Sequence, residues 1–323
     1  MNNKDKFISV EVPCYNEVDN VRPMAETLIK IMDKEGYPYH VFFIDNCSTD
    51  GTQDVLRELA KEYPQVKAIM NMRNYGVTDG RSFENADRYY ADADVHISIA
   101  CDFQEPPELI PQFIREWENG NKIVCGQKTG SKEGRIKYGL RCLYYKIIQG
   151  FSMTEQYRNM SGILLFDKDV HDAMAGKDRD IEFRFAVADM GYDVKLIQYE
   201  QQKRKSGKSS YNIWRYLSFA INSMVNTSTQ PLRIITIMGF CMSFISFMGG
   251  MIYLILKLIF WYNFDAGIAP ILIGMLFIGS IQMFTMGVIG EYIGVLIRKN
   301  THMPKVVLSE KLNIDEGKVT DNK

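Results

Sequence analysis

The chain has 323 residues, a formal net charge of -1 and 46% hydrophobic residues. This length suffices for one or two domains with a sizeable core, and the near-zero charge argues against a general nucleic-acid binder. The 6 cysteines lie apart, without paired spacing or a matching histidine pattern, so we expect neither a disulfide framework nor a zinc site. The polar N-terminus followed by a strand-like stretch lacks the pattern of a signal peptide.

Up to residue 212 the sequence alternates between strand-like and helix-like stretches. The expected strands cover 7–13, 40–46, 66–72 and 95–102, and the expected helices cover 17–32, 49–63 and 79–91. Apolar strands that alternate with helices are typical of an α/β fold with a mostly parallel sheet. We therefore predict an α/β domain over 1–212, with helices flanking the sheet.

Polar side chains follow several of these strands. They are Tyr15, Asn16, Glu17, Asp45, Asn46, Arg73, Asn74, Asp102 and Gln104. In open α/β sheets, ligands bind beyond the carboxyl ends of the strands. The sequence therefore points to this edge of the sheet as the place of function.

The later part of the chain contains two long apolar runs, 234–261 and 268–297. As a helix, each is long enough to cross a hydrocarbon core of about 30 Å. We predict two transmembrane helices within 232–299, preceded by a juxtamembrane helix over 213–231. A pair of buried helices in a large soluble core is the alternative.

Charged residues at the ends of the apolar runs predict an orientation. Arg233 precedes the first run, Arg298 and Lys299 follow the second, and the connecting loop carries Asp265 but no basic residue. By the positive-inside rule, the α/β domain and the tail over 300–323 are both expected in the cytoplasm.

Residues 131–151 form a stretch in which basic and apolar residues interleave. This pattern suits an amphipathic helix near 134–150 that lies at a bilayer surface. An ordinary amphipathic surface helix is the alternative.

Four motifs occur in order along the first part of the chain. They are VPCYNE (12–17), IDNCSTDGT (44–52), RNYG (73–76) and CDFQEPPELI (101–110). Together they resemble the family 2 glycosyltransferases, which have a GT-A fold. RKSGKSSY (204–211) and GEYIG (290–294) narrow the resemblance to the polyprenyl-phosphate glycosyltransferases, the group of bactoprenol glucosyltransferase and dolichol-phosphate mannose synthase.

This resemblance implies a site for a nucleotide diphosphate sugar, expected to be a UDP-sugar. The residues expected to line it are Pro13, Tyr15, Asn16, Glu17, Asp45, Arg73, Asn74, Cys101 and Asp102. Asp45 is expected to accept the uracil N–H. For Asn16, capping of the following helix is an alternative or additional role.

The resemblance also implies a divalent cation, Mg²⁺ or Mn²⁺, which neutralises the leaving diphosphate. Asp102 offers a carboxylate and Gln104 a carbonyl, and residues two apart share a face in an extended chain. Relatives usually carry a further aspartate where this chain has Ala100. A strand-end aspartate in an Asx turn is the alternative for Asp102.

Basic and hydroxyl residues near the expected membrane surface are candidates for the acceptor phosphate. These are Arg135, Lys137, Arg204 and Ser209, and we take Asp102 and Arg204 as the catalytic residues. A simple positive-inside cluster is the alternative for the segment around Arg204. No general base is assigned, because Gly162 stands where some relatives have an aspartate.

The activity expected from the resemblance is an inverting transfer of a sugar to a polyprenyl phosphate such as undecaprenyl phosphate, serving cell-envelope or O-antigen modification. The expected setting is the bacterial inner membrane, with assembly as a homotetramer. Two alternatives stay open: a non-catalytic homologue that binds nucleotide sugar or lipid, and a polysaccharide synthase.

Overall fold

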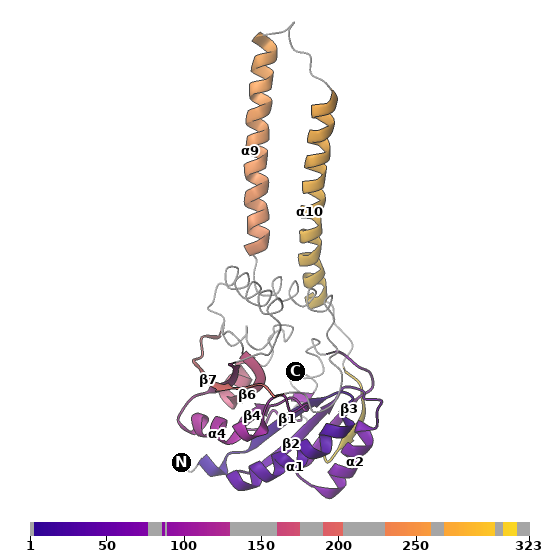
Figure 1. Cartoon of the computed structure of the whole chain (residues 1–323), viewed down its shortest axis with the longest axis vertical. Coiled ribbons are helices and arrows are strands. Elements are labelled where there is room, and N and C mark those ends of the chain that lie inside the picture. The colour runs from indigo at the N-terminus through magenta and orange to yellow at the C-terminus, as the bar shows by residue number, and fades with distance from the viewer. Residues whose placement is uncertain are drawn as a thin grey trace. The chain divides into compact units, whose positions relative to one another are not determined.

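The computed structural model describes residues 3–76, 86–87, 89–129, 160–174, 190–202, 230–259, 268–300 and 306–314. The chain divides into two units, which we treat separately. The first comprises Met1–Tyr145, Thr154–Asn212 and Met303–Lys323, and the second comprises Lys146–Met153 and Ile213–His302. Figure 1 labels most of their helices and strands.

The first unit is built on one sheet of eight strands in the order β7-β5-β6-β4-β1-β2-β3-β8. The strands are β1 (Ile8–Cys14), β2 (Tyr39–Asp45), β3 (Val66–Asn71), β4 (Val95–Ser98), β5 (Ile123–Lys128), β6 (Met160–Asp167), β7 (Val194–Tyr199) and β8 (Leu308–Leu312). Only the pairs that involve β6 or β8 are antiparallel. The predicted α/β fold with a mostly parallel sheet is confirmed.

Helices cover both faces of this sheet. They are α1 (Val18–Glu35), α2 (Thr52–Glu62), α4 (Ile110–Glu118) and α6 (Lys168–Met174), with short 3-10 helices η1 (Asn3–Asp5) and η2 (Pro107–Leu109). One face packs in a single core with α1, α2 and α4, through residues such as Leu28, Leu59 and Phe113. On the other face, Val170 of α6 packs against Ile123 and Phe166. The predicted helix over 79–91 lies mostly outside the described residues.

The strand β4 is shorter than predicted, because it ends at Ser98 and does not run on to Asp102. Its ladder with β1 ends where Ile99 N–H donates to the carbonyl of Glu11, at 3.0 Å. Two residues further along β1, Pro13 has no N–H with which to continue the ladder on that side. The chain from Ile99 onward is therefore free to turn.

The strand order places a reversal between β1 and β4. Successive strands β1, β2 and β3 extend the sheet in one direction, and the chain then crosses back to place β4 on the other side of β1. The loops that follow β1 and β4 therefore leave toward different sides. In open α/β sheets this switch point is where ligands bind.

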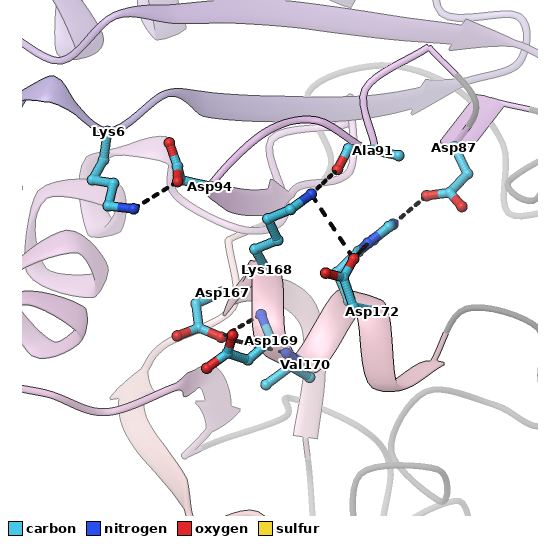
Figure 2. Close-up of polar contacts among 10 residues, drawn as sticks. Lys6, Asp87, Ala91, Asp94, Asp167, Lys168, Asp169, Val170 and Asp172 are labelled. Carbon is cyan, nitrogen blue, oxygen red and sulfur yellow. Dashed lines mark hydrogen bonds and ion pairs between the residues drawn. The ribbon is translucent and has the colours of Figure 1, made fainter. Parts of the chain in front are cut away.

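The opposite edge of the sheet, where β1 and β4 begin, is closed by polar contacts. Figure 2 shows Lys6 bound to Asp94, with 2.7 Å between Nζ and Oδ1. It also shows Lys168 Nζ donating to the carbonyl of Ala91 at 2.9 Å and facing Asp172 at 3.9 Å. These contacts tie the strand starts to α6.

The strand β8 was not predicted, because its residues were assigned only to a cytosolic tail. It pairs antiparallel with β3 and is the outermost strand on that side of the sheet. Arg57 of α2 binds Glu310, with 2.8 Å between Nη2 and Oε2, and Asn313 Nδ2 donates to the carbonyl of Ala60 at 2.6 Å. The segment after the second apolar run is thus part of the sheet.

The second unit contains two long helices, α9 (Gln230–Ile259) and α10 (Ile268–Asn300). The predicted apolar runs are therefore helical over 234–259 and 268–297. Large apolar side chains on them are exposed, among them Phe240 at 75%. Counting only the residues that the structure describes, no helix is long and apolar enough to cross a membrane. The predicted juxtamembrane helix lies outside the described residues up to its end at 230–231.

Candidate functional site

The loops after β1 and β2 interlock at the carboxyl edge of the sheet. Asn46 N–H donates to the carbonyl of Cys14 at 3.0 Å, and Asn16 N–H donates to Ser48 Oγ at 2.8 Å. In return, Thr49 N–H donates to Asn16 Oδ1 at 2.8 Å. The loops after β1 and β2 are therefore fixed to each other beside the switch point between β1 and β4.

Three non-glycine residues in the loops after β1, β2 and β4 have left-handed backbone conformations. Their φ angles are 54° at Asn16, 64° at Cys47 and 55° at Phe103. Such conformations cost of order 1–3 kcal/mol each and gather at functional sites.

The residues expected to meet the nucleotide after β1 take different positions. Tyr15 is 42% exposed. Glu17 is the N-cap residue of α1, and its Oε2 accepts a hydrogen bond from Asn20 Nδ2 at 2.6 Å. The capping role for Asn16 is wrong, because Asp50 accepts from the Val18 N–H at 3.1 Å while Asn16 bonds Thr49.

Asp45 is fully buried, at 0% exposure. Its Oδ1 accepts from Ser48 Oγ at 2.5 Å, and its Oδ2 accepts from Gln53 Nε2 at 2.7 Å and from Ser48 N–H at 3.1 Å. The carboxylate thus holds the β2 exit together. Contact with a uracil N–H stays a prediction, and it requires Asp45 to give up one of these hydrogen bonds.

Asn46, to which we assigned no role, joins the β2 exit to the RNYG segment. Its Nδ2 donates to Asn74 Oδ1 at 3.1 Å and to the carbonyl of Gly76 at 3.3 Å, and its Oδ1 accepts from Tyr75 N–H at 3.0 Å. An aspartate lacks the donor for the first two contacts. In the same segment, the Arg73 guanidinium lies 4.4 Å from the centre of the Tyr75 ring.

The loop after β4 forms a turn around Asp102, which is 8% exposed. Gln104 N–H donates to Asp102 Oδ1 at 3.1 Å, so the Asx-turn alternative describes this loop. The extended geometry that placed Asp102 and Gln104 on one face is wrong, because Phe103 between them has a φ of 55°. The ligand roles of both residues stay predictions.

Glu105 is a site residue that the sequence did not reveal. It is 4% exposed, and burial raises the pKa of its carboxyl. Gly162 N–H of β6 donates to Oε1 at 2.7 Å, and Tyr199 O–H donates to the same oxygen at 3.4 Å. A Cβ at Gly162 would lie 3.3 Å from both carboxylate oxygens, so the glycine leaves room for Glu105.

The two cysteines at this edge are unsuited to nucleophilic chemistry. Cys14 and Cys101 are buried, and burial raises the pKa of both thiols well above the ordinary value. A thiol that stays protonated is a poor nucleophile and a poor metal ligand. Cys101 therefore lines the loop by packing.

The remaining predicted residues cannot be placed. Arg135, Lys137, Arg204 and Ser209 lie outside the described residues, as does the predicted amphipathic helix near 134–150.

The residues of the β4 exit fit a hard divalent cation. Within the part of the chain that the structure describes, no three His, Cys, Asp or Glu side chains gather as a metal centre. Mg²⁺, however, usually takes one or two carboxylates from the protein and the rest from phosphates and water. One carboxylate at Asp102 and one carbonyl at Gln104 match that pattern.

Comparison with known proteins agrees with this architecture. The model of glycosyl transferase family 2 matches residues 9–180. The chain belongs to glycosyl transferase family 2. The match covers β1 to β6, which carry the candidate site, and confirms the resemblance seen in the four motifs.

Individual relatives of this family 2 chain are similar over nearly its whole length. A bactoprenol glucosyl transferase of Shigella phage SfV is 28% identical, over 94% of this chain and 98% of the relative. A prophage bactoprenol glucosyl transferase homolog of Escherichia coli K12 is 28% identical, over 93% and 98%. Among solved structures, glucosyl-3-phosphoglycerate synthase from Mycobacterium tuberculosis, in complex with Mn²⁺, UDP and glucosyl-3-phosphoglycerate, has a TM-score of 0.49 and 16% identity, covering 69% of this chain and 79% of that one.

Proposed function

We propose that this glycosyltransferase moves a sugar from a nucleotide diphosphate sugar, a UDP-sugar, to a polyprenyl phosphate such as undecaprenyl phosphate. One observation carries the proposal. The similarity to bactoprenol glucosyl transferase extends over 94% of this chain, past the family 2 domain and through α9 and α10. A shared catalytic domain alone would leave the acceptor open, whereas similarity that includes the helical region favours a lipid acceptor.

The donor is proposed to bind at the switch point between β1 and β4. Tyr15 is exposed there and offers a ring face to a base or ribose. A divalent cation, held by Asp102 and Gln104, supplies neutralisation of the diphosphate charge. Arg73, which lies over the Tyr75 ring, and Asn74, which accepts a hydrogen bond from Asn46, lie at the neighbouring strand exit.

The acceptor phosphate is already anionic, so its oxygen needs little help from a base. This differs from a sugar hydroxyl, which must lose a proton as it attacks. Positioning and charge stabilisation are then the main tasks of the protein, and a single displacement inverts the anomeric carbon. We assign Arg135, Lys137, Arg204 and Ser209 to the acceptor phosphate.

The proposed setting is the bacterial inner membrane, with the α/β domain and both termini in the cytoplasm. The support is the apolar sequence of 234–261 and 268–297, with basic residues outside both runs. Exposed apolar side chains on α9 and α10 need a partner, and lipid or neighbouring copies in a homotetramer supply one. Cell-envelope or O-antigen modification is the proposed use of the product.

The test is transfer by the purified full-length protein in lipid nanodiscs. Undecaprenyl phosphate, Mg²⁺ or Mn²⁺ and a panel of UDP- and GDP-sugars are supplied, and the lipid product is identified by mass spectrometry. The proposal expects one sugar per lipid with one of the UDP-sugars. Nucleotide binding without product with any donor would favour the non-catalytic alternative, and a polymeric product would favour a synthase.

A further inference from the structure

Two loops that are far apart in the sequence meet beside the proposed cation site. One follows β4 and carries Asp102 to Glu105, and the other follows β7, which is three places away from β4 in the sheet. Gln202 N–H donates to the carbonyl of Gln104 at 3.1 Å, and Gln201 Nε2 donates to Gln104 Oε1 at 2.6 Å. The exit of β7 therefore supports the exit of β4 through main chain and side chain together.

Gln104 is consequently held at three points. Gln202 fixes its main-chain carbonyl, Gln201 contacts its side-chain oxygen, and its own N–H donates to Asp102 Oδ1 at 3.1 Å. Gln104 therefore contacts Gln201 through its side chain and Asp102 through its main-chain N–H.

The side-chain amides of Gln104 and Gln201 contact each other directly. In this arrangement the Gln104 oxygen accepts the hydrogen bond from the Gln201 amide. A carbonyl oxygen has two lone pairs, so one remains for a second partner. Hydrogen bonds from residues that do not themselves bind the metal commonly orient the groups that do.

We propose that Gln201 is a positioning residue, which orients the side-chain oxygen of Gln104 toward the divalent cation that accompanies the donor. This inference rests on the proposed function, because the cation arrives with a nucleotide diphosphate. It adds a role for the β7 exit, from which the chain continues directly into the basic segment that begins with Lys203 and Arg204.

The experiment compares Gln201→Leu with Gln202→Leu in the full-length protein. Gln202 is the matched control, since it is the adjacent residue of the same type and contacts Gln104 through its main-chain N–H, which leucine retains. Mn²⁺ affinity is measured from the EPR signal of free Mn²⁺ in the presence of UDP or GDP. Thermal unfolding and cation-free nucleotide binding are recorded for each variant, and Gln201→Ala is run in parallel in case the leucine variant does not fold.

The expected result is Mn²⁺ binding about 10-fold weaker in Gln201→Leu, with cation-free nucleotide binding unchanged and Gln202→Leu like the wild type. Unchanged Mn²⁺ affinity in Gln201→Leu would overturn the inference. Tighter binding would also overturn it, by showing that Gln201 competes with the cation. Equal losses in both variants would mean general loosening of the loop and would count against it.

Failure of the proposed function has a different signature in the same experiment. A wild-type protein that binds no Mn²⁺ with either nucleotide would overturn the cation site itself, and the role of Gln201 with it.

Discussion

The two edges of the central sheet are built differently. Where β1 and β4 begin, partly exposed pairs such as Lys6–Asp94 tie the strands together. At the opposite ends of β1, β2 and β4, carboxylates are buried and three non-glycine residues adopt left-handed backbone conformations. At the first end the Lys6–Asp94 ion pair is partly exposed, whereas at the second end the carboxylates of Asp45, Asp102 and Glu105 are buried. This contrast marks the second edge as the place where charge is used.

The largest effect is expected from Asp102, which follows β4. In Asp102→Asn the carboxylate of the proposed cation site is lost, so turnover with Mn²⁺ should fall by about 10²- to 10³-fold. The measurement is nucleotide release in the presence of polyprenyl phosphate.

The matched control for that change lies before the same strand. Asp94→Asn removes a carboxylate bound to Lys6 Nζ and to the Phe7 N–H at 2.9 Å. Turnover should stay within about 2-fold of wild type, since a partly exposed pair contributes about 0.2–1 kcal/mol to stability. Equal losses of turnover in both variants would contradict the proposal that only the carboxylate after β4 takes part in the reaction.

The next effect concerns the room that Gly162 leaves for Glu105. In Gly162→Ala the new Cβ would lie 3.3 Å from both carboxylate oxygens. Overpacking of this kind should lower the free energy of unfolding by about 1–3 kcal/mol, measured by chemical denaturation. In a Glu105→Ala background the same substitution should cost less than about 0.5 kcal/mol, because the crowding partner is gone. An equal cost in both backgrounds would mean that Glu105 is not what excludes a side chain here.

A smaller effect is expected from His40, in the half of the sheet away from the site. Burial, with the neighbouring side chains of Lys67 and His96, lowers the pKa of His40 from 6.5 to about 3. Between these values the unfolded chain binds a proton that the folded chain does not. The stability that neutral His40 confers is therefore complete above pH 6.5 and declines as the pH falls toward 3, by up to about 1.4 kcal/mol per pH unit.

This pH dependence is checked by denaturant unfolding between pH 7 and pH 5, about the pKa of an ordinary histidine. In His40→Gln the corresponding part of the slope should disappear. The same slope in both proteins would assign the acid sensitivity to other groups.

The smallest effect tests the strain at the site edge. Cys47 has a φ of 64°, which glycine adopts without penalty. Cys47→Gly should therefore be more stable than Cys47→Ala by about 1 kcal/mol, because the alanine keeps the strained backbone. Urea midpoints of the two variants give the comparison, and a less stable glycine variant would argue that the conformation costs little.

The parallel core of the first unit was predictable from the sequence, because continuous apolar runs such as 40–46 have one reasonable structure. The position of the candidate site followed from the same pattern, since strand exits in such a sheet share an edge. Local hydrogen bonding was not predictable. No pattern shows that Phe103 breaks the extended path between Asp102 and Gln104, or that Pro13 ends the ladder with β4.

Contacts between distant segments were also missed. Glu105 reads as one acidic residue among several in its motif, and its burial depends on Gly162 and Tyr199, which lie far along the chain. Gln201 reads as a polar loop residue until its contact with Gln104 is seen. Side chains whose role depends on a partner elsewhere in the sequence need coordinates to identify them.

The pairing of β3 with β8 has a consequence for biogenesis. The ribosome makes β3 early, but it makes β8 only after both long helices. During that interval β3 has no partner on its outer side. An open strand margin invites pairing with other chains. Pairing of β8 with β3 also requires contacts between very distant parts of the sequence, which form slowly. Until β8 is made, β3 is therefore the edge strand on this side of the sheet, with unpaired backbone groups that other chains can contact.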